Sequence, residues 1–403
     1  MLFLPERHEP LTGEPWDEAK ARAALLRIVA ETNAAFTQDG LWPIHPQDIS
    51  PERPPDCMKM LYNGAAGVIW ALHELAGRKF APLAHDFLPV VRSLTARHHD
   101  DLTKYEGIRN YIGHEQNGFL FGETGLDLLE WKLAPSPATS DRLAARIERK
   151  VGDNRGIVWG GAGAMLAALF LHKATGDARW RELFSRHAGA LWSQWHYDSE
   201  ARCHLWTVDL YGQVEKRLTP LHGFFANAGT LLRGADLLAE DRRNELRRRV
   251  AEAVRATAIV EDGVPNWPVS RESALPRSLY LQFCNGAPGV VVNTIDAKLG
   301  IDDLLSAGGN LAWSAGPVVK PPSLCHGAPS AGYAFLKLHA HTGSTDWLTK
   351  ARRFAMHAIA QSDAARVAHG QRKFSLWTGD LGLALYLADC LDARASFPAL
   401  DYF

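Results

Sequence analysis

The sequence lacks any strong excess of charge and any long hydrophobic run. Its 403 residues contain 44 Lys and Arg against 45 Asp and Glu, a formal net charge of -1. This balance argues against a basic face for nucleic acid and against an acidic partner surface. No window approaches the roughly 18 apolar residues of a membrane span, and residues 1–8 lack the basic and apolar regions of a signal peptide. We therefore expect a cytoplasmic protein.

Cysteine is scarce as well. An odd number of cysteines in a long chain fits reduced thiols and metal binding better than a disulfide framework. The five are Cys57, Cys203, Cys284, Cys325 and Cys390.

The remaining composition is that of an ordinary globular chain, with 46% hydrophobic and 22% charged residues. No low-complexity tail and no shift in composition divides the chain. The sequence therefore predicts one domain over residues 1–403.

A short glycine motif recurs along the whole chain. Five copies read Gly-x-x-Gly, and in two further copies Ala or Ser replaces the last glycine. The five complete copies lie at 64–67, 122–125, 160–163, 286–289 and 379–382, and the two others lie at 223–226 and 327–330. The intervals are wide enough for two helices and their loops, so the sequence predicts seven repeated units.

Each glycine motif leads into a run with few charges, which is typical of a buried helix. Charge-studded amphipathic stretches lie between these runs and predict outer helices with one solvated face. They cover 17–36, 82–98, 139–151, 177–195, 240–260 and 346–361. We therefore predict an all-α fold, an α/α toroid of seven helical hairpins, with the inner helix N-termini gathered around one opening. Residues 206–212 and 213–218 alternate like a short β-hairpin.

Two of the motifs are headed by cysteine. The sequence Cys-Asn-Gly-Ala-Pro-Gly at 284–289 returns as Cys-His-Gly-Ala-Pro-Ser at 325–330. Cys284, Cys325 and His326 would supply three of the four tetrahedral positions of zinc and leave one for water or a substrate. The alternative is that both cysteines are buried small hydrophobic residues and that His326 caps a helix.

These motifs together resemble the lanthionine synthetase C family, especially its stand-alone LanC-like branch. The resemblance rests on the seven glycine turns, on Phe-Cys-Asn-Gly-Ala-Pro-Gly at 283–289, on Leu-Cys-His-Gly at 324–327, on His-Gly at 222–223 and on Phe-Ser-Leu-Trp-Thr-Gly-Asp-Leu-Gly at 374–382. It implies a zinc ion held by Cys284, Cys325 and His326. The implied reaction adds a thiol to dehydroalanine or dehydrobutyrine and forms a thioether.

The resemblance also implies roles for residues outside the metal site. His222 matches the family's acid/base histidine, and Lys320 resembles the lysine that contacts the carboxylates of glutathione. Gly156 stands where peptide-cyclising relatives carry Asp, and Asp153 is the nearest carboxylate. His222 could instead be a loop or capping residue, and Lys320 a solvated loop charge.

Two classes of function remain open. An enzyme would join a peptide cysteine or glutathione to a dehydroamino acid in a peptide or protein, with no nucleic acid involved. The alternative is a scaffold that binds zinc and glutathione without turnover. Helical-toroid glycosidases and prenyltransferases would need paired carboxylates or an Asp-rich site where this chain has cysteines.

Overall fold

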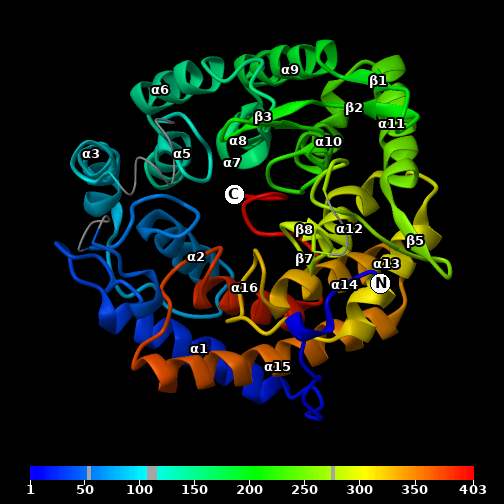
Figure 1. The fold of residues 1–403 in the computed structure, drawn as a ribbon. Helices are drawn as coiled ribbons and strands as arrows, with labels where there is room; N and C mark the ends of the chain where they lie inside the picture. Colours follow the sequence, from blue (N-terminus) through cyan, green and yellow to red (C-terminus); the bar gives the residue numbers. More distant parts are fainter. Residues whose placement is uncertain (52–55, 107–115, 274–276) are drawn as a thin grey trace.

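The computed structural model describes residues 1–51, 56–106, 116–273 and 277–403. Its helices form two concentric rings, with seven inner helices surrounded by seven outer ones (Figure 1). The inner helices are α2 (Ala65–Gly77), α5 (Glu123–Leu133), α8 (Gly161–Thr175), α10 (Phe224–Arg233), α12 (Ala287–Thr294), α14 (Ala328–Thr342) and α16 (Asp380–Asp392). The outer helices are α1 (Glu18–Ala35), α3 (Leu88–Lys104), α6 (Pro137–Glu148), α9 (Ala178–Ser193), α11 (Glu240–Thr257), α13 (Asp302–Ala315) and α15 (Thr345–His369). The predicted toroid of seven hairpins is confirmed.

The glycine motifs mark where the inner helices begin. The first glycine of every copy is the N-cap of an inner helix, from Gly64 before α2 to Gly379 before α16. The runs that follow are almost wholly buried. Among the described helices, none combines the length and hydropathy that a membrane crossing requires.

The second glycine of each complete motif permits a close approach of two backbone segments. A Cβ atom added at this position would lie only 1.9 to 2.3 Å from the carbonyl oxygen of the residue six places earlier. The positions are Gly67, Gly125, Gly163, Gly289 and Gly382. Because real Cβ atoms do not approach an oxygen so closely, any side chain here would push the turn away from its helix.

The outer helices follow the prediction less closely. All six predicted stretches contain a helix, but the stretch expected to reach residue 260 ends its helix at Thr257, and Ile259–Glu261 forms a strand. The seventh outer helix, α13, was not assigned a range. It carries Gly308 and Gly309, which pack against the rings of Trp267 and Trp347, so its sequence does not show a charge-studded helical pattern.

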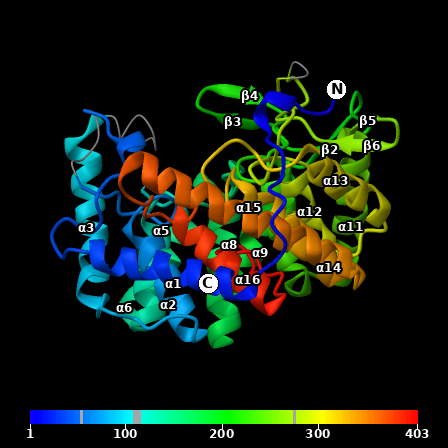
Figure 2. The same ribbon diagram turned by 90° about the horizontal axis from the view of Figure 1, so that it is seen from below.

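Short β-hairpins connect several helices and stand on one face of the ring, where the N-terminus also lies (Figure 2). The predicted hairpin is confirmed as β3 (Val208–Leu210) paired with β4 (Gln213–Glu215). Three other antiparallel pairs were not predicted. They are β1 (His196–Asp198) with β2 (Cys203–Leu205), β5 (Ile259–Glu261) with β6 (Val264–Asn266), and β7 (Leu281–Gln282) with β8 (Asn285–Gly286). The other short elements are η1 (Pro5–Arg7), η2 (Pro46–Asp48), α7 (Gly156–Trp159), η3 (Ala235–Leu237) and η4 (Ile295–Ala297).

Backbone hydrogen bonds join the turns of neighbouring units. The N–H of Cys284 donates to the carbonyl of Cys325 at 3.1 Å, and the N–H of Cys325 donates to the carbonyl of Trp377 at 3.0 Å. The N–H of Trp377 donates in turn to the carbonyl of Tyr62 at 2.9 Å. This last bond links the seventh unit to the first and so closes the ring.

The C-terminal segment fills the axis of the ring (Figure 1). The ring of Phe403 packs against Trp70, Phe119 and Phe170, and the ring of Phe397 packs against Phe283, Tyr333 and Trp377. Asp401 forms ion pairs with Arg233 and Lys337, each at 2.7 Å. The segment therefore contacts the inner part of all seven units.

The close approach at the second glycine can be tested on α2, which carries glycine at both ends. We expect Gly67→Ala to lower the free energy of unfolding by about 1–3 kcal/mol, because the added Cβ is forced against the Leu61 carbonyl. Gly77→Ala, where nothing lies within 4 Å of the added atom, should be neutral or stabilising by up to about 1 kcal/mol. Denaturant unfolding measures both, and equal effects would contradict the steric explanation.

Candidate metal centre

Cys284 and Cys325 occupy equivalent places in two neighbouring units, since each stands two residues before the first glycine of its turn. Tyr62 and Trp377 hold the same place in the first and last units. Because the backbones of neighbouring turns are hydrogen-bonded, side chains at this place are brought close to one another. The repeat therefore places the two cysteines side by side.

The structure brings the three predicted ligands together. The Sγ atoms of Cys284 and Cys325 and a ring nitrogen of His326 all lie within 4.8 Å of one another, and no other such group of potential ligands occurs among the described residues. Around a tetrahedral zinc ion with Zn–S bonds of about 2.3 Å, two sulfurs would be about 3.8 Å apart. The arrangement therefore fits zinc with little movement of the side chains.

Hydrogen-bond donors surround both sulfurs. The hydroxyl of Tyr62 donates to Cys325 Sγ at 2.9 Å, while Gln282 Nε2 and Asn285 Nδ2 donate to Cys284 Sγ at 3.1 and 3.3 Å. Such donors stabilise thiolates and fix the direction of metal ligands. Neither Tyr62 nor Gln282 was expected at this site from the sequence. The place of Tyr62 in the repeat, equivalent to that of the cysteines, could have revealed it.

The two thiols differ in their acidity. A hydrogen bond from Cys325, helped by His326, lowers the pKa of the Cys284 thiol to about 5 although burial acts against this. Burial and the neighbouring Cys284 sulfur raise the pKa of the Cys325 thiol well above its usual value. The protein alone therefore supports one negative charge in this pair. A bound cation would be needed before the second sulfur could ionise, which again fits a metal site.

His222 lies outside this cluster. It stands one residue before Gly223, the place that His326 holds before Gly327. Burial, followed by the charge of Arg217, lowers the pKa of His222 to about 3, so its imidazole is neutral near pH 7. Its Nδ1 is enclosed and has no hydrogen-bond partner among the described residues.

Lys320 is exposed near the centre. Its charge contributes to lowering the pKa values of both the Cys284 and the Cys325 thiols. Within the described parts of the chain, no carboxylate forms an ion pair with its ammonium group. A cation without a partner therefore stands close to the two sulfurs.

The third turn has no room for a carboxylate at residue 156. Gly156 has φ +80°, and a Cβ there would lie 2.3 Å from the Leu221 carbonyl oxygen and 2.7 Å from the Cα of His222. The nearby Asp153 is held by Arg155 Nη2 at 2.6 Å. Burial alone would raise the pKa of Asp153, but the hydrogen bonds from Arg155 and the charge of Lys150 lower it. Asp153 is therefore a fixed carboxylate and not a proton donor.

Comparison with known proteins supports the fold and the family. The solved structure of nisin cyclase superimposes on this protein with a TM-score of 0.55. The match covers 94% of this chain and 98% of the nisin cyclase chain at 11% identity, which shows a common fold. A zebrafish (Danio rerio) relative named glutathione S-transferase LANCL1 is 34% identical over 136 residues. That match covers 31% of this chain and 32% of the relative, so it spans about a third of either protein.

The family comparison extends much further along the chain. The model of the family described as lanthionine synthetase C-like protein matches residues 56–401. This match includes every inner helix and all three residues of the candidate metal centre. The chain belongs to the lanthionine synthetase C-like protein family.

Proposed function

We propose that this protein forms a thioether by adding a thiol to the β-carbon of dehydroalanine or dehydrobutyrine. The observation that carries the proposal is the cluster of two cysteine sulfurs and one imidazole, with hydrogen-bond donors directed at both sulfurs. The names of the relatives, a glutathione S-transferase and a nisin cyclase, support a reaction at sulfur. The thiol is glutathione or a peptide cysteine, and the electrophile is a dehydroamino acid in a peptide or protein.

In this proposal Cys284, Cys325 and His326 hold zinc. When bound, zinc lowers the pKa of a coordinated thiol so that the thiol reacts as a thiolate. Tyr62 and Gln282 keep the two cysteine sulfurs directed toward the ion. The exposed ammonium group of Lys320 attracts the carboxylates of an anionic thiol such as glutathione.

His222 is the proposed acid/base residue. The reaction moves one proton from the incoming sulfur to the α-carbon of the electrophile, while the C–S bond forms at the β-carbon. A neutral imidazole can accept that proton, and the imidazolium so formed can give it to the α-carbon. None of the described residues hydrogen-bonds to its Nδ1, so no protein group there competes for the proton.

A second candidate function is a scaffold that binds zinc and glutathione without turnover. The feature that favours it is Gly156, because the third turn has no room for a second acid/base carboxylate and Asp153 is already paired. We also propose that the protein works in the cytoplasm. All five cysteines are free thiols in the structure, which suits a reducing compartment.

Metal analysis tests the zinc site. We expect about one zinc per chain in the parent protein and little in Cys325→Ala, because loss of one of three protein ligands leaves an incomplete site. Cys390→Ala, which removes an equally buried thiol outside the cluster, is the matched control and should keep its zinc. Full zinc content in Cys325→Ala would contradict the proposed site.

The reaction is tested by incubating zinc-loaded protein with glutathione and a dehydroalanine peptide and measuring the adduct by mass. We expect His222→Asn to keep its zinc and its affinity for glutathione but to form adduct at least about tenfold more slowly. His196→Asn, on an exposed strand, should behave like the parent.

Each other result has a distinct meaning. Unchanged turnover in His222→Asn would make that histidine a structural residue. Loss of zinc would make it a fourth ligand. No adduct with the parent protein would favour the scaffold.

A further inference from the structure

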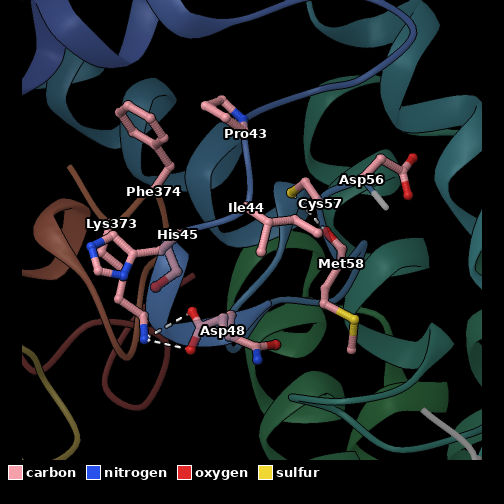
Figure 3. Close-up of a pocket in the computed structure, with 11 residues that line it drawn as sticks. Pro43, Ile44, His45, Asp48, Asp56, Cys57, Met58, Lys373 and Phe374 are labelled. Atoms are coloured by element: carbon pink, nitrogen blue, oxygen red, sulfur yellow. Dashed lines mark hydrogen bonds and ion pairs between the residues drawn. The ribbon is translucent and has the colours of Figure 1, made fainter. Parts of the chain in front are cut away.

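A small pocket lies where the first and seventh units meet (Figure 3). Three segments line it. They are residues 43–48 of the connection before α2, residues 56–63 that lead into α2, and residues 373–375 before α16. None of the three candidate zinc ligands lines this pocket, so it is a separate space.

Two segments of the pocket wall lead directly to residues that contact the metal centre. Asn63 in its wall directly follows Tyr62, whose hydroxyl donates to Cys325 Sγ. Ser375 stands two residues before Trp377, whose carbonyl accepts the backbone N–H of Cys325. Asn63 also holds the place in its turn that His326 holds in its own. The pocket therefore lies beside two of the turns that surround the sulfurs.

Much of the wall is apolar. Pro43, Ile44, Met58 and Phe374 contribute carbon and sulfur surface (Figure 3). The thiol of Cys57 donates to the Met58 carbonyl at 3.0 Å, and burial raises its pKa to about 12, so it stays uncharged. This part of the pocket suits a hydrocarbon side chain.

The charged groups of the pocket are already paired. Lys373 Nζ lies 2.9 Å from Asp48 (Figure 3), and Asp56 is held by Lys59 and Arg97 at 2.9 and 3.0 Å. Burial, with smaller effects of the Lys373 and His369 charges, lowers the pKa of His45, so its ring is neutral near pH 7. An anionic group such as a carboxylate of glutathione would find no free cation here.

One polar atom in the wall remains unsatisfied. Asn63 Oδ1 is enclosed, and none of the described residues donates a hydrogen bond to it. A buried carbonyl oxygen without a donor is costly. The backbone N–H of a bound peptide would supply the missing donor.

We propose that this pocket binds an apolar side chain adjacent to the dehydroamino acid of a peptide substrate, with Asn63 Oδ1 accepting a hydrogen bond from the peptide backbone. The identity of the ligand as a peptide rests on the proposed function. The apolar preference rests on the lining alone.

Binding of unreactive peptides tests the proposal without catalysis. Two synthetic peptides carry alanine in place of dehydroalanine and differ only in the next residue, Leu or Asp. Calorimetry with the full-length, zinc-loaded protein should give at least about tenfold tighter binding of the Leu peptide, because its side chain is buried in the pocket. Equal affinities would overturn the proposal.

Two variants locate the preference. Met58→Asp places a carboxylate in the pocket and should remove the preference for Leu, whereas Ile49→Asp places the same group on an exposed position outside it and should keep the preference. Asn63→Ala should weaken the binding of both peptides to the same extent. Retention of the preference in Met58→Asp, with folding checked by circular dichroism, would show that the peptide binds elsewhere.

The same two peptides with dehydroalanine in place of alanine show whether adduct forms. Comparing adduct formation with binding tests the pocket and the proposed reaction separately. Adduct formation without a Leu preference in binding would overturn the pocket and leave the thioether chemistry intact. A Leu preference in binding without any adduct would support the pocket and contradict the chemistry.

Discussion

Backbone hydrogen bonds between neighbouring turns are the interaction on which the ring and its metal centre both depend. The bond from Cys284 N–H to the Cys325 carbonyl holds two turns at a separation that also brings their sulfurs together. Such an approach requires turns packed tightly against their own helices, which is what glycines such as Gly289 permit. The steric condition that shapes five of the seven inner helices, including the one after Cys284, therefore contributes to the geometry of the site.

A ring of seven inner helices would leave its axis empty, and the C-terminal segment removes that void. Phe397 stacks on Phe283, the residue before Cys284, with ring centroids 4.5 Å apart. Asp401 is half-buried beside Arg233 and Lys337. Their charges hold its pKa well below the usual value, although burial acts in the opposite direction. The C-terminal segment therefore fills the axis of the ring and packs against the turn that carries Cys284.

Features set by a few neighbouring residues, such as the starts of the inner helices, could be predicted from the sequence. Features that depend on packing between distant units could not. The glycine motifs predicted where all seven inner helices start, because each motif is a local turn that needs glycine. They also predicted that Cys284 and Cys325 lie together, because both cysteines hold the same place in the repeat. The helix α13 was missed because Gly308 and Gly309 pack against Trp267 and Trp347. Three of the four short strand pairs were missed because strands of two or three residues carry too little sequence pattern. The contact of Tyr62 with Cys325 spans 263 positions. The equivalent places of the two residues in the repeat could have suggested it, but the hydrogen bond itself forms only because the ring closes.

In the proposed site, the charged Lys320 is exposed, and the more buried His222 is neutral. Lys320 stands in solvent near the rim, where an ammonium group can attract an anionic thiol without a large desolvation cost. Burial of the imidazole, with a smaller effect of the Arg217 charge, lowers the pKa of His222 and keeps its ring neutral. If His222 were charged in the resting protein, it could not accept a proton from the incoming thiol. In the proposed reaction, the exposed cation would therefore attract the thiol, and proton transfer would fall to a residue that is neutral before the thiol arrives.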